Sequence, residues 1–211
     1  MTSIGNRRTT EDARASLFVD WSNIYIGRRE VALRFGEDPL AVRVSASRLA
    51  SLMAFGRPLA ERTAVVNAAE TSRDAQRRIA EGFRVIPAWP AADGLEQTND
   101  ALLRERMWEA LEMLEPGVMV VASGDGNGWD LGEGFSRPLL AARRRGWAVE
   151  IVSWRESLHG RLESTVRELG GAVILLDDYY EQITFVEGGR LPRPLNLTHR
   201  QSSDPSDLAA A

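Results

Sequence analysis

The chain has 211 residues, of which 44% are hydrophobic and 27% are charged, and its formal net charge is −4. This length suits one α/β domain with a well-buried core, and no apolar stretch approaches the roughly 20 residues that cross a bilayer. The absence of cysteine excludes disulfides, thiolate zinc sites and thiol nucleophiles. Any metal must therefore be held by oxygen atoms or by the two histidines.

All 26 basic residues are arginine, and lysine is absent. This excludes the lysine of a phosphate-binding P-loop and a lysine Schiff base. Arginine favours bidentate phosphate contacts, so the clusters at 28–29, 77–78 and 143–145 are candidates for a nucleic-acid track or for solvated helix faces. The negative net charge argues against a surface that is basic throughout.

In chain order, short apolar runs predict six buried strands, and the segments between them predict helices. The strands are expected at 17–20, 63–68, 83–88, 118–122, 148–153 and 172–176. The helices are expected directly after residue 20, after a cap at Ser45, and at 71–82, 99–115, 137–145 and 157–169. Alternating strands and helices predict a three-layer α/β/α sandwich with a mainly parallel central sheet.

The two ends of the chain have no core pattern. Residues 1–15 are polar and aperiodic, which predicts a flexible tail. Residues 188–211 include the proline-rich sequence L-P-R-P-L and predict a disordered tail. The folded domain is therefore expected to span residues 16–187.

Three acidic residues lie where a predicted strand ends or a predicted helix begins. Asp20 follows the first strand, Asp125 follows the strand 118–122, and Asp100 opens the helix 99–115. Each has a local explanation as a helix cap or a turn former. However, the carboxyl ends of parallel strands meet at one edge of a sheet, where ligands bind.

Carboxylates gathered at that edge would repel one another. Two of them roughly 5 Å apart, at an effective dielectric constant near 20, repel by about 3 kcal/mol, and a divalent cation offsets that cost. Oxygen-only ligation suits Mg²⁺ or Mn²⁺ better than zinc. The three acids therefore indicate metal-assisted hydrolysis, with Asp20, Asp100 and Asp125 as the metal ligands.

The sequence resembles the NYN domains of the PIN-like nuclease superfamily. The resemblance lies in F-V-D-W-S-N-I-Y at 18–25, T-N-D-A-L at 98–102 and V-V-A-S-G-D-G-N at 120–127. It extends to W-R-E-S-L-H-G-R-L at 154–162 and L-L-D-D-Y at 175–179, so it covers roughly residues 16–187. It implies a PIN-like, Rossmann-like sandwich and a ribonuclease that uses Mg²⁺ or Mn²⁺ to hydrolyse RNA phosphodiester bonds.

The resemblance also implies roles for individual residues. Asp20, Asp100 and Asp125 would hold the metal and, with Asn23, form the catalytic set. Asn23 would orient the site or contact a phosphate. The residues expected to face the RNA are Asn23, Ser123, Asn127 and Arg28.

One departure from the family pattern concerns the residue two positions after Asp125. The family usually has an acid there, whereas this chain has Asn127. Either Asp130 or Glu133 in the following glycine-rich loop replaces that acid, or the loop is a plain insertion. An alternative function is therefore an RNA-binding or regulatory module with weak or no catalysis.

Two further alternatives stay open from the residues alone. Asp20 as the nucleophile of a phosphotransfer domain is a less favoured reading, because D-W-S-N lacks a second aspartate two residues on. Trp21 and Tyr25 either stack an unpaired base or pack against the sheet. We expect a cytoplasmic protein with RNA as its partner and no membrane contact, and we leave open a homodimer.

Overall fold

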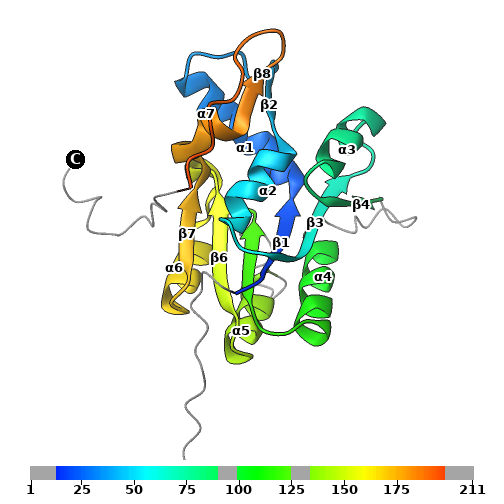
Figure 1. The fold of residues 1–211 in the computed structure, drawn as a ribbon, viewed down its shortest axis with the longest axis vertical. Helices are drawn as coiled ribbons and strands as arrows, with labels where there is room; N and C mark the ends of the chain where they lie inside the picture. The colour runs from blue at the N-terminus through cyan, green and yellow to red at the C-terminus, as the bar shows by residue number, and fades with distance from the viewer. Residues whose placement is uncertain (1–12, 90–98, 125–133, 198–211) are drawn as a thin grey trace, which may run out of the picture.

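The computed structural model describes residues 13–89, 99–124 and 134–197. Its main sheet has the strand order β4-β3-β1-β5-β6-β7, and every neighbouring pair is parallel (Figure 1). The strands are β1 (Ala15–Asp20), β3 (Leu59–Asn67), β4 (Arg84–Ala88), β5 (Val118–Ala122), β6 (Ala148–Ser153) and β7 (Ala172–Leu175). All six overlap the strands expected from the apolar runs.

Helices cover both faces of this sheet, which confirms the predicted α/β/α sandwich. The period of two along β1 sends Leu17 and Val19 into one core and Phe18 into the other. The first core contains α1 (Trp21–Arg34), α2 (Ala46–Ala54), α3 (Arg73–Ala80) and α7 (Tyr180–Ile183); the second contains α4 (Asn99–Met113), α5 (Ser136–Arg144) and α6 (Gly160–Glu168). Figure 1 shows α2 crossing in front of the sheet. Among the described residues, no helix is both long and apolar enough to cross a membrane.

The strand order changes direction at β1. The chain proceeds from β1 to β3 and β4 on one side, then returns to β5 on the other side of β1 and continues to β6 and β7. In open parallel sheets, ligands bind outside the carboxyl ends of the strands at such a reversal. The carboxyl ends of β1 and β5 are therefore where a site is expected.

A second, two-stranded sheet lies outside the predicted pattern. It joins β2 (Val42–Val44) and β8 (Thr184–Val186) in antiparallel register. No strand is expected at β2 from the sequence, because three residues are too few to show a period and the partner strand is far away in the chain. The expected helix 157–169 begins later, as α6 at Gly160, and Ser157 instead ends a separate 3₁₀ turn, η1 (Arg155–Ser157).

Both predicted tails are shorter than the sequence indicated. At the first end, the Arg14 side chain donates to the carbonyl of Leu59 at 2.9 Å, and Ala15 is fully buried. At the other end, the backbone N–H of Arg193 donates to the carbonyl of Glu181 at 2.8 Å. Leu195 and Leu197 pack against the core, so the segment 188–197, which the sequence predicts to be disordered, makes contacts with the domain. The rest of each predicted tail, 1–12 and 198–211, lies outside the described residues.

Candidate active site

Asp20 ends β1 and caps α1. Its Oδ1 accepts hydrogen bonds from the backbone N–H groups of Ser22, at 3.0 Å, and Asn23, at 3.3 Å. The residue is 6% exposed. These bonds satisfy two of the orphan donors at the helix start and fix the direction in which the carboxylate points. Asp20 therefore caps α1 through Oδ1, and this cap is compatible with the predicted role of its carboxylate at the end of β1.

Asn99 brings the start of α4 to the same carboxylate. Its side-chain amide donates to Asp20 Oδ1 at 3.3 Å and to Ser22 Oγ at 2.8 Å. Asp100, the next residue, lies in the first turn of α4. Asp20 and Asp100 are two of the three predicted metal ligands. The hydrogen bond from Asn99 to Asp20 therefore joins the end of β1 to the start of α4, where Asp100 lies.

Asn23 makes the corresponding link to the end of β5. Its side-chain carbonyl oxygen accepts a hydrogen bond from the backbone N–H of Gly124 at 2.9 Å. Gly124 directly precedes Asp125. Of the two roles predicted for Asn23, this contact corresponds to orienting the site.

Gly124 is also held from the opposite side, by the segment that follows β6. A Cβ atom on Gly124 would lie 2.2 Å from the carbonyl oxygen of Ser157, and the Gly124 carbonyl accepts from the backbone N–H of His159 at 2.9 Å. Such a close approach between backbones requires glycine. The glycine of the S-G-D motif therefore has a packing role at this position.

The same segment packs against α1. The Trp154 indole N–H donates to the carbonyl of Ile24 at 2.8 Å, and a Cβ on Gly27 would lie 2.4 Å from both Ser157 Oγ and Trp154 Cδ1. The first turns of α1, the end of β5 and η1 therefore form one close-packed unit. Such a unit is a rigid support for the side chains at the strand ends.

Four residues of the predicted site fall outside the described part of the chain: Asp125, Asn127, Asp130 and Glu133. Within the described ranges, no group of three or more histidine, aspartate or glutamate side chains lies close enough to hold a metal ion. Asp20 and Asp100 are two of three predicted ligands, and they supply carboxylate oxygens, which suit Mg²⁺ or Mn²⁺. The metal site itself stays a prediction.

Two residues expected to contact the substrate occupy buried positions instead. Ser123 and Arg28 are both 0% exposed. Arg28 Nε donates to the carbonyl of Val42 at 2.9 Å, and its guanidinium lies 3.5 Å from the centre of the Tyr25 ring. Burial lowers the pKa of Arg28 to about 10, so the side chain keeps its charge at neutral pH. Arg28 links α1 to β2 and is buried, so its role in this structure is not the predicted contact with the substrate.

Asn99 and Ser22 belong to the candidate site, although neither is among the residues expected there from the sequence. Both have signals that were available: Asn99 precedes Asp100 in the T-N-D motif, and Ser22 lies between Asp20 and Asn23 in D-W-S-N. Polar side chains between predicted ligands are candidates for holding those ligands in place. Their contact with each other depends on the fold.

Comparison of the chain with protein-family models found no match, and comparison with curated proteins found none either. The resemblance to NYN domains rests on the motifs quoted above and stays a prediction.

Proposed function

We propose that this protein is a metal-dependent ribonuclease whose active site lies at the carboxyl ends of β1 and β5. The observation that carries this proposal is the pair of asparagine links, from Asn99 to Asp20 and from Asn23 to Gly124. They hold together three segments that are far apart in the sequence, and each segment contains or adjoins a predicted metal ligand. These links lie at the topological reversal of the sheet, which is where open parallel sheets bind their ligands.

The residues that would hold the metal are Asp20, Asp100 and Asp125. When bound, a divalent cation neutralises charge on the phosphodiester and activates a water for attack. The described residues around these ligands act by positioning. The amide of Asn99 and the first backbone N–H groups of α1 hold the Asp20 carboxylate, and Asn23 holds the backbone directly before Asp125.

The test is cleavage of labelled single-stranded and structured RNAs by the purified protein in Mn²⁺ or Mg²⁺. We expect cleavage by the wild type and its loss in Asp20→Asn, Asp100→Asn and Asp125→Asn. Asp74→Asn is a matched control, because Asp74 is on α3 with a side chain that is 79% exposed. Equal cleavage by the wild type and all four variants, or no cleavage of any RNA, would overturn the proposal.

A second candidate function is an RNA-binding or regulatory module with weak catalysis, and the observation that favours it is Asn127 in place of an acid. With one charge fewer, the site would bind a divalent cation less tightly. This candidate predicts RNA binding that falls with salt and no cleavage in Mn²⁺. The appearance of cleavage in Asn127→Asp would support it, whereas efficient cleavage by the wild type would exclude it.

A further inference from the structure

A pocket of about 740 Å³ opens directly beside the candidate active site. Trp21 and Ser22, the first two residues of α1, line one end of it. Ser22 is the residue whose hydroxyl accepts a hydrogen bond from Asn99, which also donates to Asp20. The other walls come from α3 and from the β2–β8 sheet. The lining of the pocket is therefore linked to Asp20 through Ser22 and Asn99.

The lining of the pocket carries both signs of charge. Three arginines, Arg29, Arg43 and Arg78, line it together with two glutamates, Glu70 and Glu81. The lining therefore has an excess of one positive charge, which is too small for a basic groove that follows a phosphate backbone. It suggests instead a localised position for one anion.

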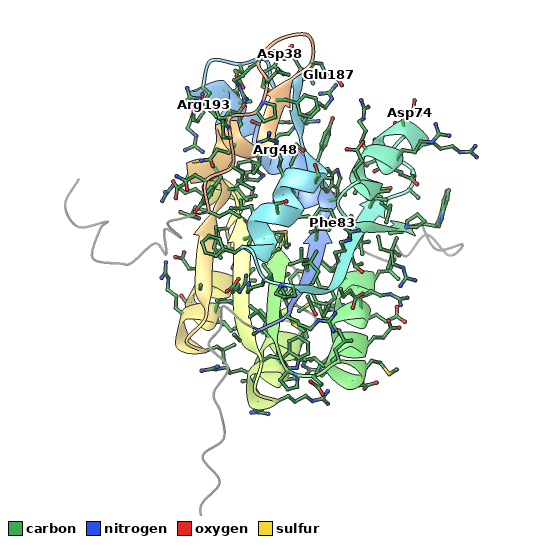
Figure 2. All side chains as sticks on the ribbon, viewed as in Figure 1. Asp38, Arg48, Asp74, Phe83, Glu187 and Arg193 are labelled. Atoms are coloured by element: carbon green, nitrogen blue, oxygen red, sulfur yellow. The ribbon has the colours of Figure 1, made fainter. Side chains whose placement is uncertain are left out.

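Such a position is marked by Glu187, which follows β8. One oxygen of its carboxylate lies 3.1 Å from Arg43 Nη2, on β2, and the other lies 3.5 Å from Arg78 Nη1, on α3. Figure 2 shows Glu187 and Asp74 at the same end of the molecule, where α3 and the β2–β8 sheet lie. Two arginines from separate elements thus converge on one carboxylate at the edge of the pocket.

A phosphodiester group has the chemistry that this pair of arginines accepts. It carries one negative charge shared by two oxygens, as a carboxylate does, and guanidinium groups bind both kinds of anion through paired hydrogen bonds. The present ion pairs are exposed, with side-chain exposures of 57% for Arg78 and 44% for Glu187. Exposed ion pairs contribute little to stability, so a competing anion can displace the carboxylate.

The pocket also offers aromatic surface next to this anion position. Tyr25 and Phe185 line it, and both are partly exposed. The buried guanidinium of Arg28 stacks on the Tyr25 ring, which positions that ring at the wall of the pocket. Aromatic rings beside arginines are the usual means of holding an unpaired base and its phosphate.

We propose that this pocket binds a short single-stranded segment of the RNA next to the cleaved bond, with Arg43 and Arg78 holding one phosphate in the place of Glu187. The choice of RNA rests on the proposed function. The volume is within the range of about 300–1,000 Å³ found for small-ligand pockets, so it fits one or two nucleotides and excludes a double helix. Glu187 is then an internal competitor of the substrate.

The experiment measures binding without cleavage. Fluorescence anisotropy would follow a labelled single strand of about eight nucleotides, a length typical of single-strand sites, and a matched duplex. The protein is the full chain carrying Asp20→Asn, with EDTA present. We expect the single strand to bind more tightly than the duplex, with a slope of about −0.7 per phosphate contact in a plot of log affinity against log salt concentration.

Substitutions separate the pocket from general charge effects. We expect Arg43→Gln and Arg78→Gln each to weaken binding of the single strand about five- to tenfold, because each removes a charge-assisted contact. Glu187→Gln should strengthen binding of the single strand about two- to fivefold by removing the competing carboxylate.

Each kind of substitution has a matched control. For Arg78 it is Arg77→Gln, since Arg77 is on the same helix, is not among the residues that line the pocket, and pairs with Asp74. Glu163→Gln is the matched control for Glu187, because its carboxylate pairs with Arg167 within α6.

The outcomes also distinguish this inference from the proposed function. Equal effects of Arg78→Gln and Arg77→Gln, unchanged binding in Glu187→Gln, or equal binding of duplex and single strand would overturn the pocket assignment, even if the wild type cleaves RNA. The expected binding pattern without any cleavage would support the pocket and overturn the nuclease. Since Arg43 also donates to the carbonyl of Val42, a thermal melt of each variant shows whether its fold is intact, and Arg78→Gln alone suffices for the decision.

Discussion

The side-chain carbonyl oxygen of Asn23 accepts a hydrogen bond from the backbone N–H of Gly124 at 2.9 Å, which joins the first turn of α1 to the end of β5. The two residues are 101 positions apart in the chain. Because β1 and β5 are neighbours at the reversal of strand order, this bond sets how their carboxyl ends lie relative to each other. The position of the residue after Gly124 depends on it.

Removing that acceptor should therefore affect both stability and activity. In Asn23→Ala the N–H of Gly124 loses its partner in a buried position, which costs about 1–3 kcal/mol in the free energy of unfolding. We expect a lower melting temperature and RNA cleavage at least about tenfold slower. Asn23→Asp keeps an oxygen acceptor and should retain more of the stability. Wild-type melting and cleavage in Asn23→Ala would contradict this role.

Asn99 supports a prediction about metal dependence. In Asn99→Asp the amide donor that lies 3.3 Å from Asp20 Oδ1 becomes a carboxylate, and the repulsion costs about 1–4 kcal/mol at the effective dielectric constant of a protein surface. We expect a lower melting temperature without metal and a larger rise on adding Mn²⁺ than in the wild type, because the ion binds the folded state. Asn99→Ala loses the donor without adding charge. An identical metal response in the two variants would count against a cation site beside Asp20.

Gly124 tests the close packing of the strand end. A methyl group added there would lie 2.2 Å from the carbonyl oxygen of Ser157, which is backbone and cannot rotate away. We expect Gly124→Ala to lose about 1–3 kcal/mol of stability and most of its RNA cleavage, as the segment must move away from Asn23. Gly160→Ala is the control, because no atom lies within 4 Å of the corresponding position. Chemical denaturation and a cleavage assay on both variants check the prediction.

The buried ion pair between Arg57 and Glu150 should contribute to stability but not to catalysis. Both guanidinium Nη atoms lie 2.8 Å from the carboxylate oxygens of Glu150, and Arg57 also donates to the carbonyls of Met53 and Ala54. Arg57→Gln removes the guanidinium from a buried carboxylate, which costs about 3–5 kcal/mol. The double variant Arg57→Met/Glu150→Leu should be less destabilised in urea titrations. A greater loss in the double variant than in the single one would reject this account.

Glu37 predicts a pH dependence of stability. Its carboxylate accepts hydrogen bonds from Arg190 and, at 2.6 Å, from the hydroxyl of Tyr180. The bond from Arg190 is the main cause that holds the pKa of Glu37 below its ordinary value of 4.5, and burial opposes it. A lowered folded-state pKa stabilises the protein above about pH 4.5, and that contribution is lost as the pH falls through the folded-state pKa.

Glu37→Gln should therefore be less stable than the wild type at pH 7, by about 1–2 kcal/mol. The difference between the two proteins should shrink below pH 4.5, as the wild-type carboxylate takes up a proton. Thermal melts of both proteins between neutral and acidic pH would show this. A difference that stays constant or grows toward acidic pH would contradict the role of the ionised carboxylate.

The sequence was sufficient to predict the main sheet, because each of its strands is a short apolar run whose burial is decided locally. The unbroken runs Leu17–Val19 and Val118–Ala122 indicate strands buried on both faces, and both are almost fully buried. Two of the acids could also be located, since Asp20 ends a predicted strand and Asp100 opens a predicted helix. The α/β/α architecture follows from this alternation alone.

Contacts between distant segments needed the tertiary structure. Nothing near Arg28 in the sequence shows that its guanidinium is buried and donates to the carbonyl of Val42 on β2, so the sequence predicts a contact with RNA instead. The pairing of β2 with β8 joins segments of three residues that carry no period of their own. The link from Asn99 to Asp20 and the meeting of Arg43 and Arg78 at Glu187 depend on how helices are set against the sheet.

Local hydrophobic pattern therefore determined which segments of this protein are buried, because transfer of apolar surface from water depends on composition and period. The partners of the polar side chains were decided only by the fold, because a hydrogen bond or an ion pair requires two groups within a few ångströms of each other.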